Sequence, residues 1–221
     1  MTIEIQNLTK TISGVNILDN INLTMNPGVI IGLSGINGSG KTMLMRMISG
    51  LIKPTKGVIY IDGKRLWQDI SFPESLGILI ENPAFIDTYS GVQNLKMIAS
   101  VKGNIVEEQV RDMIEKVGLD PNDKKKYRKY SLGMKQRLGI AAALMESPDI
   151  ILLDEPTNAL DSSGVELIKM LINKEKARGA YVVISCHDSA IMQELADEIY
   201  FMESGKVTKR GSAQKSQVVT G

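Results

Sequence analysis

Residues 35 to 42 read Gly-Ile-Asn-Gly-Ser-Gly-Lys-Thr, residue types and a spacing that suit phosphate binding. The glycines let successive backbone N–H groups turn toward one anion, and a helix starting near Lys41 would point its positive dipole end at it. Lys41 can reach the β- and γ-phosphates of a nucleotide, and the Thr42 hydroxyl can ligate Mg²⁺. A chance glycine-rich turn is the alternative, but the position between a buried strand and an amphipathic helix favours a nucleotide site. We therefore expect the nucleotide to contact Gly35, Asn37, Gly38, Ser39, Gly40, Lys41, Thr42 and Met43.

A second set of chemical groups follows the apolar run Ile150 to Leu153, which ends in Asp154 and Glu155. An aspartate at a strand end suits Mg²⁺ held through its water shell. The adjacent Glu155 can polarise an attacking water as a general base. Alone, the pair could be an acidic turn. Downstream of a phosphate-binding loop it predicts nucleotide hydrolysis.

The elements that must position these groups follow from the hydrophobic pattern. Ile3 to Gln6 and Ile17 to Met25 alternate apolar and polar residues, as half-buried strands do. Val29 to Leu33 is typical of a strand buried on both faces. The phosphate loop comes next, then a helix whose apolar face holds Leu44, Met47, Ile48 and Leu51.

The middle of the chain changes character. The pattern predicts that residues 87 to 144 are mostly helical. Part of this pattern is an apolar stripe at Val106, Val110, Met113, Ile114 and Val117. From Ile150 strands and helices alternate again, so the fold class is α/β with a helical insertion. We expect one domain over residues 1–208, a helical subdomain inserted at about 87–146, and a polar tail at 209–221. The basic run Lys124 to Lys129 is expected to be a solvated loop.

Composition narrows the function classes. The 26 basic and 25 acidic residues leave a net charge of +1, so no nucleic-acid partner is expected. Cys186 is the only cysteine, which favours a reducing compartment. No apolar run approaches the roughly 20 residues that a spanning helix needs, and no signal peptide begins the chain. Any membrane role is therefore expected to come through a partner.

Three further segments resemble the ABC ATPase family. The run Tyr130 to Leu138, Tyr-Ser-Leu-Gly-Met-Lys-Gln-Arg-Leu, resembles its signature segment. Asn158 to Asp161 resembles its D-loop, and His187 its switch histidine. The segments keep the family's order over about residues 2 to 208. The resemblance implies a P-loop NTPase of ABC ATPase type, with a mainly parallel core sheet, an N-terminal antiparallel β subdomain and an inserted helical subdomain.

The resemblance also implies a shared site. Ser131 suits an N-cap, and a helix N-terminus there, with Gly133, would face the γ-phosphate held by another subunit. The cofactors would be ATP and Mg²⁺, and the chain would act as a homodimer or with a paired ATPase subunit. Leu132 and Met134 replace the family's glycine and glutamine. His187 would join Lys41 and Glu155 as catalytic residues, although a lone histidine can also be structural.

Two positions depart from the family pattern. Glu81 stands where the family usually has the Q-loop glutamine, so it joins Thr42 and Asp154 as an expected metal contact, with an acidic loop residue as the alternative. Ile12 falls where an aromatic ring usually stacks on adenine. We expect it to pack on the purine without an aromatic face.

The function implied is ATP hydrolysis that powers transport through integral membrane permease subunits, at the cytoplasmic face of the plasma membrane. Phe85, Ile86 and Tyr89 are candidate docking contacts, unless they are simply buried. The variant signature and Glu81 resemble the bacitracin and lantibiotic exporters, which implies export of an antimicrobial peptide or drug. One alternative is a soluble ABC ATPase acting on nucleic acid or the ribosome. Another is a regulator that does not hydrolyse, against which Glu155 and His187 argue.

Overall fold

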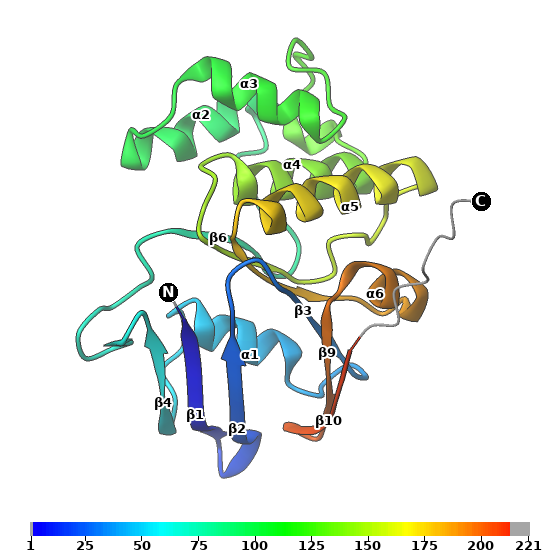
Figure 1. Ribbon diagram of the computed structural model, residues 1–221. Helices are drawn as coiled ribbons and strands as arrows, with labels where there is room; N and C mark the ends of the chain where they lie inside the picture. The colour runs from blue at the N-terminus through cyan, green and yellow to red at the C-terminus, as the bar shows by residue number, and fades with distance from the viewer. Residues whose placement is uncertain (1, 213–221) are drawn as a thin grey trace.

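The computed structural model describes residues 2–212 and contains two sheets (Figure 1). The N-terminal sheet has the order β2-β1-β4-β5, and all its pairings are antiparallel. Ile3 of β1 pairs with Met25 on one side and Ile61 on the other. The sheet comprises β1 (Ile3–Ile12), β2 (Val15–Met25), β4 (Lys56–Ile61) and β5 (Lys64–Arg65). The predicted antiparallel β subdomain is confirmed.

The second sheet has the order β10-β9-β3-β8-β7-β6 and is parallel except for its β10–β9 edge. Its strands are β3 (Ile30–Ser34), β6 (Leu76–Leu79), β7 (Ile150–Leu153), β8 (Tyr181–Ser185), β9 (Glu198–Glu203) and β10 (Lys206–Ser212). Because side chains alternate along a strand, Ile151 and Leu153 join one hydrophobic core while Ile150 and Leu152 join another. The predicted mainly parallel core sheet is confirmed.

Helices pack on both faces of this sheet (Figure 1). The core around Ile151 and Leu153 includes residues of the helical subdomain, which is inserted between β6 and β7. The core around Ile150 and Leu152 includes residues of α1 and of the antiparallel sheet. The helices are α1 (Lys41–Ile48), α2 (Gly91–Lys102), α3 (Glu107–Lys116), the 3₁₀ turn η1 (Tyr127–Lys129), α4 (Leu132–Leu144), α5 (Ser162–Ala177) and α6 (Ser189–Leu195).

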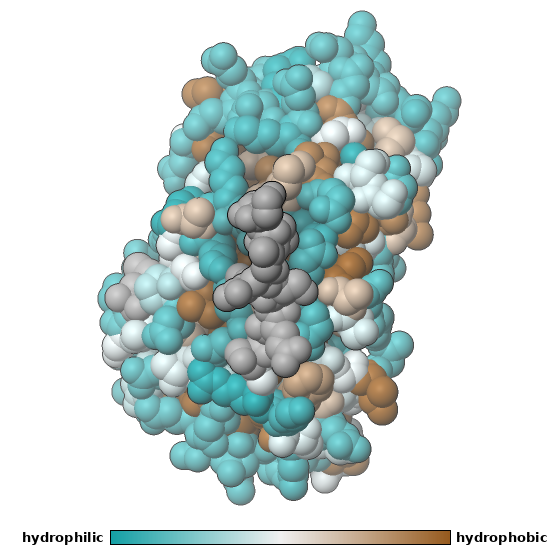
Figure 2. Space-filling view, turned by 45° about the vertical axis from the view of Figure 1, so that its right-hand side comes forward, coloured by the Kyte–Doolittle hydropathy of each residue, from teal (hydrophilic) through white to brown (hydrophobic). Residues whose placement is uncertain are grey.

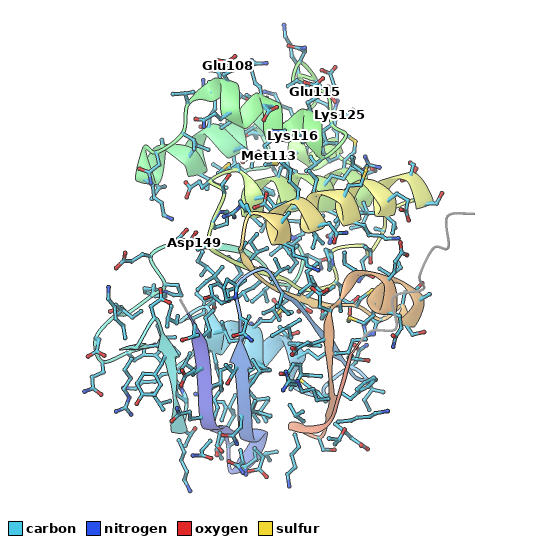
Figure 3. The ribbon with its side chains drawn as sticks, in the orientation of Figure 1. Glu108, Met113, Glu115, Lys116, Lys125 and Asp149 are labelled. Carbon is cyan, nitrogen blue, oxygen red and sulfur yellow. The ribbon has the colours of Figure 1, made fainter. Side chains whose placement is uncertain are left out.

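The helical subdomain forms the end of the molecule away from the antiparallel sheet. Hydrophilic side chains cover most of that end, and hydrophobic groups appear there in small separate patches (Figure 2). Glu108, Glu115, Lys116 and Lys125 all lie at this end (Figure 3). No helix within residues 2–212 combines the length and the apolar character needed to cross a bilayer.

Helix α4 lies against β6 at unusually short range. A Cβ atom on Gly77 would come 1.9 Å from the Ala143 carbonyl oxygen, and one on Gly139 would come 2.8 Å from Pro83 Cβ. Such separations are far below van der Waals contact, so only glycine fits at Gly77 without a shift of backbone. The C-terminal part of α4 is thereby fixed to the sheet.

Two sequence expectations are corrected by the structure. Leu51 was placed on the apolar face of the first helix, but α1 ends at Ile48 and Leu51 is 60% exposed. Gly50, with a φ of 84°, turns the chain away from the helix direction. The polar tail was expected from residue 209, but β10 continues to Ser212, and residues 213–221 lie outside the described part of the chain.

Candidate nucleotide-binding and catalytic site

The phosphate loop connects β3 to α1 and is held by its own lysine. Lys41 Nζ donates hydrogen bonds to the Gly35 carbonyl at 2.6 Å and the Ile36 carbonyl at 3.1 Å, and Lys41 is only 6% exposed. A Cβ atom on Gly35 would come 2.3 Å from the Met202 carbonyl oxygen. The loop therefore needs glycine there, and it is shaped before any ligand binds.

Ser39 leaves an unused polar group inside this loop. Its Oγ atom is buried and has no hydrogen-bond partner among the described residues. Leaving a buried hydroxyl unpaired costs about 1–3 kcal/mol, so this hydroxyl requires a hydrogen-bond partner. Phosphate oxygens fit that requirement, because the hydroxyl lies in a loop that also carries Lys41 and a helix N-terminus.

Asp154 is set by two hydroxyl groups from other elements. Thr42 Oγ1 donates to Asp154 Oδ2 at 2.6 Å, and the Ser185 hydroxyl donates to Oδ1. Asp154 and Ser185 are both buried. A hydroxyl and a carboxylate that converge beside a phosphate loop are hard oxygen donors of the kind that Mg²⁺ takes, together with nucleotide phosphates. The residues present therefore fit this ion.

Glu155 and His187 also meet, as expected of a catalytic pair. His187 Nε2 lies 3.3 Å from Glu155 Oε1, and the His187 backbone N–H donates to Oε2 at 3.1 Å. Glu155 has a φ of 51°, a left-handed conformation that re-aims its side chain after β7. Gln136 donates from Nε2 to the Glu155 carbonyl at 2.9 Å. This link from α4 to the base position escaped the sequence analysis.

These groups line one cavity of about 400 Å³ at the carboxyl ends of the parallel strands. Its walls are Ile17, Asn37, Gly38, Ser39, Gly40, Lys41, Thr42, Met43, Arg46, Glu81, Asp154, Glu155 and His187. Open α/β sheets bind ligands at this edge. Four loops that follow β3, β6, β7 and β8 thus bring the predicted phosphate, metal and base residues together.

Glu81 lies at this cavity, but its carboxylate has a partner that sequence reasoning missed. It forms an ion pair with the guanidinium of Arg46, which lies on α1. Glu81 itself is exposed and has a φ of 64°. In the structure the charge of Glu81 is therefore matched by Arg46.

Ile12 does not line the cavity. It lies next to the β1–β2 turn and is half-exposed, whereas Ile17 on β2 contributes to the cavity wall. That Ile12 packs on the purine of the nucleotide remains a proposal. Ile17 is an additional candidate, and it was missed because an alternating strand pattern does not mark which residue meets a ligand.

The predicted signature segment forms a second, separate cavity. The Ser131 hydroxyl accepts a hydrogen bond from the Met134 N–H at 3.2 Å and caps α4, as expected. A Cβ atom on Gly133 would lie 2.8 Å from the Ala159 carbonyl oxygen, so this helix end touches the 158–161 loop. Leu132 is 64% exposed. The cavity, of about 550 Å³, is lined by Gly118, Leu119, Ser131, Leu132, Gly133, Met134, Arg137, Ala159, Leu160 and Asp161.

Asp161 fixes the loop on the other side of this cavity. Its carboxylate accepts from Ser163 Oγ at 2.9 Å and the Gly164 N–H at 3.0 Å, and it caps α5. The Ser163 hydroxyl first, then the Gly164 N–H and the Arg137 charge, hold the pKa of Asp161 below its usual range. Arg137 Nη2 lies 3.1 Å from Asp161, so α4 and this loop are tied together.

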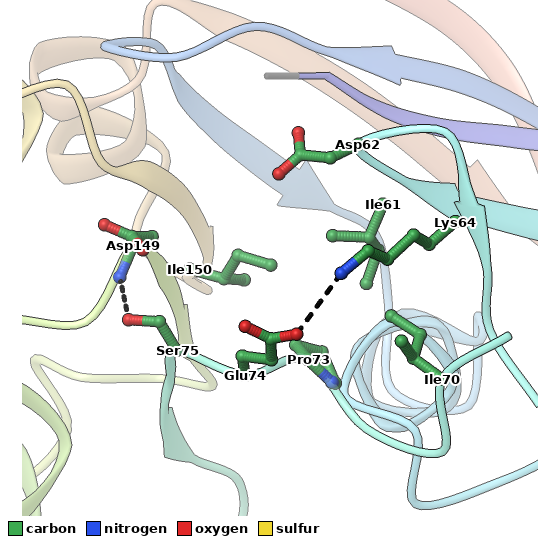
Figure 4. A pocket seen from close by; sticks show the side chains of 9 residues that line it. All are labelled: Ile61, Asp62, Lys64, Ile70, Pro73, Glu74, Ser75, Asp149 and Ile150. Atoms are coloured by element: carbon green, nitrogen blue, oxygen red, sulfur yellow. Dashed lines mark hydrogen bonds and ion pairs between the residues drawn. The ribbon is translucent and has the colours of Figure 1, made fainter.

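A smaller cavity of about 110 Å³ lies at the opposite ends of the strands (Figure 4). Ser75 and Asp149, which precede β6 and β7, are joined by a 2.9 Å hydrogen bond. Lys64 and Glu74 form an ion pair across it at 3.3 Å. None of the predicted site residues lines it. Its position excludes it from the chemistry at the phosphate loop.

Fold and site together define a nucleotide-hydrolysing α/β protein, and comparison with known families identifies its class. Residues 18–158 match the family model described as ABC transporter, so the chain belongs to this family. It is an ATP-binding subunit of the transporter type, with ATPase activity.

Particular relatives make the match finer. An uncharacterized ABC transporter ATP-binding protein, YybJ of Bacillus subtilis, is 47% identical over 93% of this chain and 94% of its own length. The lantibiotic transport ATP-binding protein SrtF of Streptococcus pyogenes is 37% identical over 93% and 88%. The bacitracin transport ATP-binding protein BcrA of Enterococcus faecalis is 37% identical over 94% and 68%.

A solved structure with bound nucleotide has a similar fold. The ATP-binding cassette MJ0796, described as a dimeric post-hydrolysis state bound to ADP and Pi, superposes with a TM-score of 0.86. It is 25% identical, and the match covers 97% of this chain and 100% of that one. The predicted family, fold class and ATPase activity are confirmed.

Proposed function

We propose that this chain hydrolyses Mg²⁺-ATP as one half of an ATPase pair that powers an exporter of antimicrobial peptides or drugs. The observation that carries the pairing is that one chain holds two separate half-sites. The cavity at Lys41 and the cavity at Ser131 share no residue. The N-terminus of α4 is suited to bind an anion, but the phosphate-binding loop of the same chain belongs to the other cavity. A second copy, or a paired ATPase subunit, would supply the phosphate.

The proposed chemistry divides among the residues at the strand ends. Lys41, the Ser39 hydroxyl and the loop N–H groups bind the phosphates and neutralise their charge. Thr42 and Asp154 would hold Mg²⁺, which when bound withdraws charge from the phosphate oxygens. Glu155 accepts the proton of the attacking water as that oxygen joins the γ-phosphorus and ADP leaves. His187 orients the Glu155 carboxylate, because both its backbone N–H and its ring nitrogen contact it.

The transport role is supported by the relatives and by the surface near Glu81. SrtF and BcrA are named as lantibiotic and bacitracin transport proteins. Ile86 and Tyr89 are exposed apolar residues a few positions beyond Glu81, while Phe85 packs its ring edge against Tyr127. Ile86 and Tyr89 therefore suit contact with separate membrane subunits, whereas Phe85 is partly buried against the core. The chain would then work at the cytoplasmic face of the plasma membrane.

The test is to isolate the complex and then measure protection. Tagged Glu155→Gln chain, purified with ATP from native membranes, should bring down a polypeptide with several membrane spans. Expression of both in a sensitive bacterium should raise the inhibitory concentration of a lantibiotic or of bacitracin. The same pair carrying Glu155→Gln should give no protection. A complex that forms and hydrolyses ATP but protects against neither compound would remove this substrate class and leave the ATPase role.

A further inference from the structure

Residues 124–129, termed here the basic segment, carry five cations around one aromatic residue. Lys124, Lys125, Arg128 and Lys129 are exposed. Within residues 2–212 no side-chain hydrogen bond or ion pair involves Lys124, Arg128 or Lys129, and Lys125 reaches Asp123 only at 4.0 Å. Many other cations of the chain do form ion pairs, including the exposed Lys96 and the partly exposed Arg111 and Lys116. The basic segment therefore presents unmatched charge.

This segment is nevertheless held in place. Tyr127 is buried, donates its hydroxyl to the Pro83 carbonyl at 2.5 Å and packs edge-on against Phe85 with ring centroids 5.2 Å apart. Burial raises the pKa of the Tyr127 hydroxyl above its usual value. The neighbouring cations consequently project from a fixed backbone, which lowers the entropy lost when they bind a partner.

The basic segment lies beside the apolar docking residues. The Tyr127 N–H donates to the Tyr89 carbonyl at 2.8 Å, and the Arg128 N–H donates to the Asp87 carbonyl at 3.2 Å. Ile86 is 37% exposed and Tyr89 is 40% exposed. The result is a surface on which the exposed Ile86 and Tyr89 lie beside the unpaired cations of the basic segment. Lys125 marks its position near the end of the helical subdomain (Figure 3).

We propose that this surface binds an acidic docking segment of the membrane subunit. At least two carboxylates of that segment would face Arg128 and Lys129, and an apolar side chain would cover Ile86 and Tyr89. The inference rests on the proposed function, since it assumes a membrane partner and adds its chemistry. Opposite charges on the two surfaces orient the partners and raise the rate of association, and added salt weakens this attraction.

The position also connects docking to the second half-site. Tyr130 follows the basic segment, and its hydroxyl accepts the Gly91 N–H at 3.2 Å. Ser131, the next residue, caps α4. A partner that moves the basic segment therefore moves the helix end that would face the phosphate of the opposing subunit.

An anionic lipid surface is the competing occupant. Lipid headgroups require only diffuse positive charge, whereas this surface joins the cations to an exposed apolar pair through backbone hydrogen bonds. A folded protein segment with one apolar and one acidic face matches both parts of this surface at once. The observations therefore favour a protein partner, and the experiment includes the lipid as an outcome.

The experiment measures rebinding of purified full-length chain to inside-out membrane vesicles from cells that express it, after the native chain has been stripped off. Charge reversal by Arg128→Glu with Lys129→Glu should weaken rebinding roughly tenfold at low salt, as expected for two rim charge pairs. The charge-preserving variant Arg128→Lys with Lys129→Arg should bind like wild type. Lys53→Glu with Lys56→Glu, two exposed cations at the antiparallel sheet, serves as the matched control and should also bind like wild type.

Photo-crosslinking from position 128 then identifies what the surface touches. The expected product is a peptide of a multi-span membrane protein that contains clustered Asp or Glu. A crosslinked peptide without net negative charge overturns the proposal. So does binding to protein-free phosphatidylglycerol vesicles that is lost in the charge-reversed variant, because it assigns the surface to lipid.

The two levels of proposal fail differently. Wild-type rebinding that ignores both salt and the charge reversal overturns the acidic docking segment alone. Absence of wild-type rebinding at every salt concentration overturns the membrane role and this inference with it. ATP binding and basal hydrolysis of the variants should stay at wild-type levels, since residues 128 and 129 do not line the nucleotide cavity.

Discussion

The two half-sites of this chain are built in opposite ways. At the phosphate loop, Ser39, Lys41 and Asp154 are all buried, and Lys41 and Asp154 are held by hydrogen bonds from inside the chain. At the signature segment, Ser131 and Leu132 are exposed, and a capped helix end rests on the loop that follows β7. The first is a nearly finished site that awaits a ligand. The second is a donor surface whose ligand must come on another subunit.

This difference teaches where substitutions should act. Changes at the phosphate loop should alter binding or turnover in each chain by itself. Changes at the signature segment should act only when two chains meet around ATP. Four predictions test this division.

The largest effect is expected at Glu155. Glu155→Gln keeps the size of the side chain but removes its basicity, so turnover should fall by about 10²–10⁴-fold. ATP affinity should stay near the wild-type value, since the phosphate-binding groups are untouched. Steady-state phosphate release together with nucleotide titration measures both. Wild-type turnover in this variant would remove Glu155 from the role of base.

The next effect concerns association. ATP with Mg²⁺ should strengthen dimerisation of the Glu155→Gln chain by about 100-fold, the upper range of ligand coupling, while ADP should not. Sedimentation velocity with each nucleotide measures this.

Leu132→Asp sharpens the same test. A carboxylate in the first turn of α4 suits the helix dipole and should leave the monomer stable, but it would repel a phosphate held by the partner. We expect ATP to bind and the dimer to be lost. A Leu132→Asp chain that dimerises normally would contradict the pairing of the two half-sites.

A smaller effect is expected for Ser39→Ala. Its buried hydroxyl has no partner in the structure, so its removal should leave the free energy of unfolding of the nucleotide-free protein unchanged or higher. ATP affinity should fall about tenfold, because a hydrogen bond to a charged group contributes roughly 1.5–3 kcal/mol. Thermal unfolding with and without ATP separates the two. A variant that loses stability without nucleotide and keeps its affinity would refute the assignment.

The smallest effect concerns Glu81 and Arg46. If the Glu81 carboxylate turns to the metal when nucleotide binds, Glu81→Gln should raise the Mg²⁺ concentration for half-maximal activity a few-fold and leave the maximum within several-fold. Arg46→Gln should lower that concentration, because it releases the carboxylate from its ion pair. Free-metal titrations compare both variants with wild type. Superimposable curves would confine Glu81 to its contact with Arg46.

The sequence predicted those site residues that belong to a short motif with a fixed spacing. Gly35 and Gly40, which have positive φ angles, and the acidic pair after β7 are such cases, since each can be recognised within a segment of a few residues. Sequence reasoning missed Arg46, Gln136 and Ser185, whose partners lie 19 to 35 residues away. Contacts of that kind depend on how helices and strands pack, and no periodic pattern records them. Strand β6 was also missed, because Gly77 interrupts its apolar run, whereas the equally short β7 is apolar throughout.

The glycine contact between α4 and β6 has a mechanical consequence. With Ala143 resting on Gly77, the C-terminal part of α4 is a fulcrum, and the Ser131 end moves together with the 158–161 loop, to which Arg137 ties the helix. The twelve steps along the helix from Ser131 to Ala143 span about 18 Å at 1.5 Å per residue. A rock of about 10° at the fulcrum would carry the Ser131 cap through about 3 Å, roughly the length of one hydrogen bond. A small tilt of the helical subdomain is therefore sufficient to make or break contact with a phosphate across a dimer, and no unfolding or long travel is required.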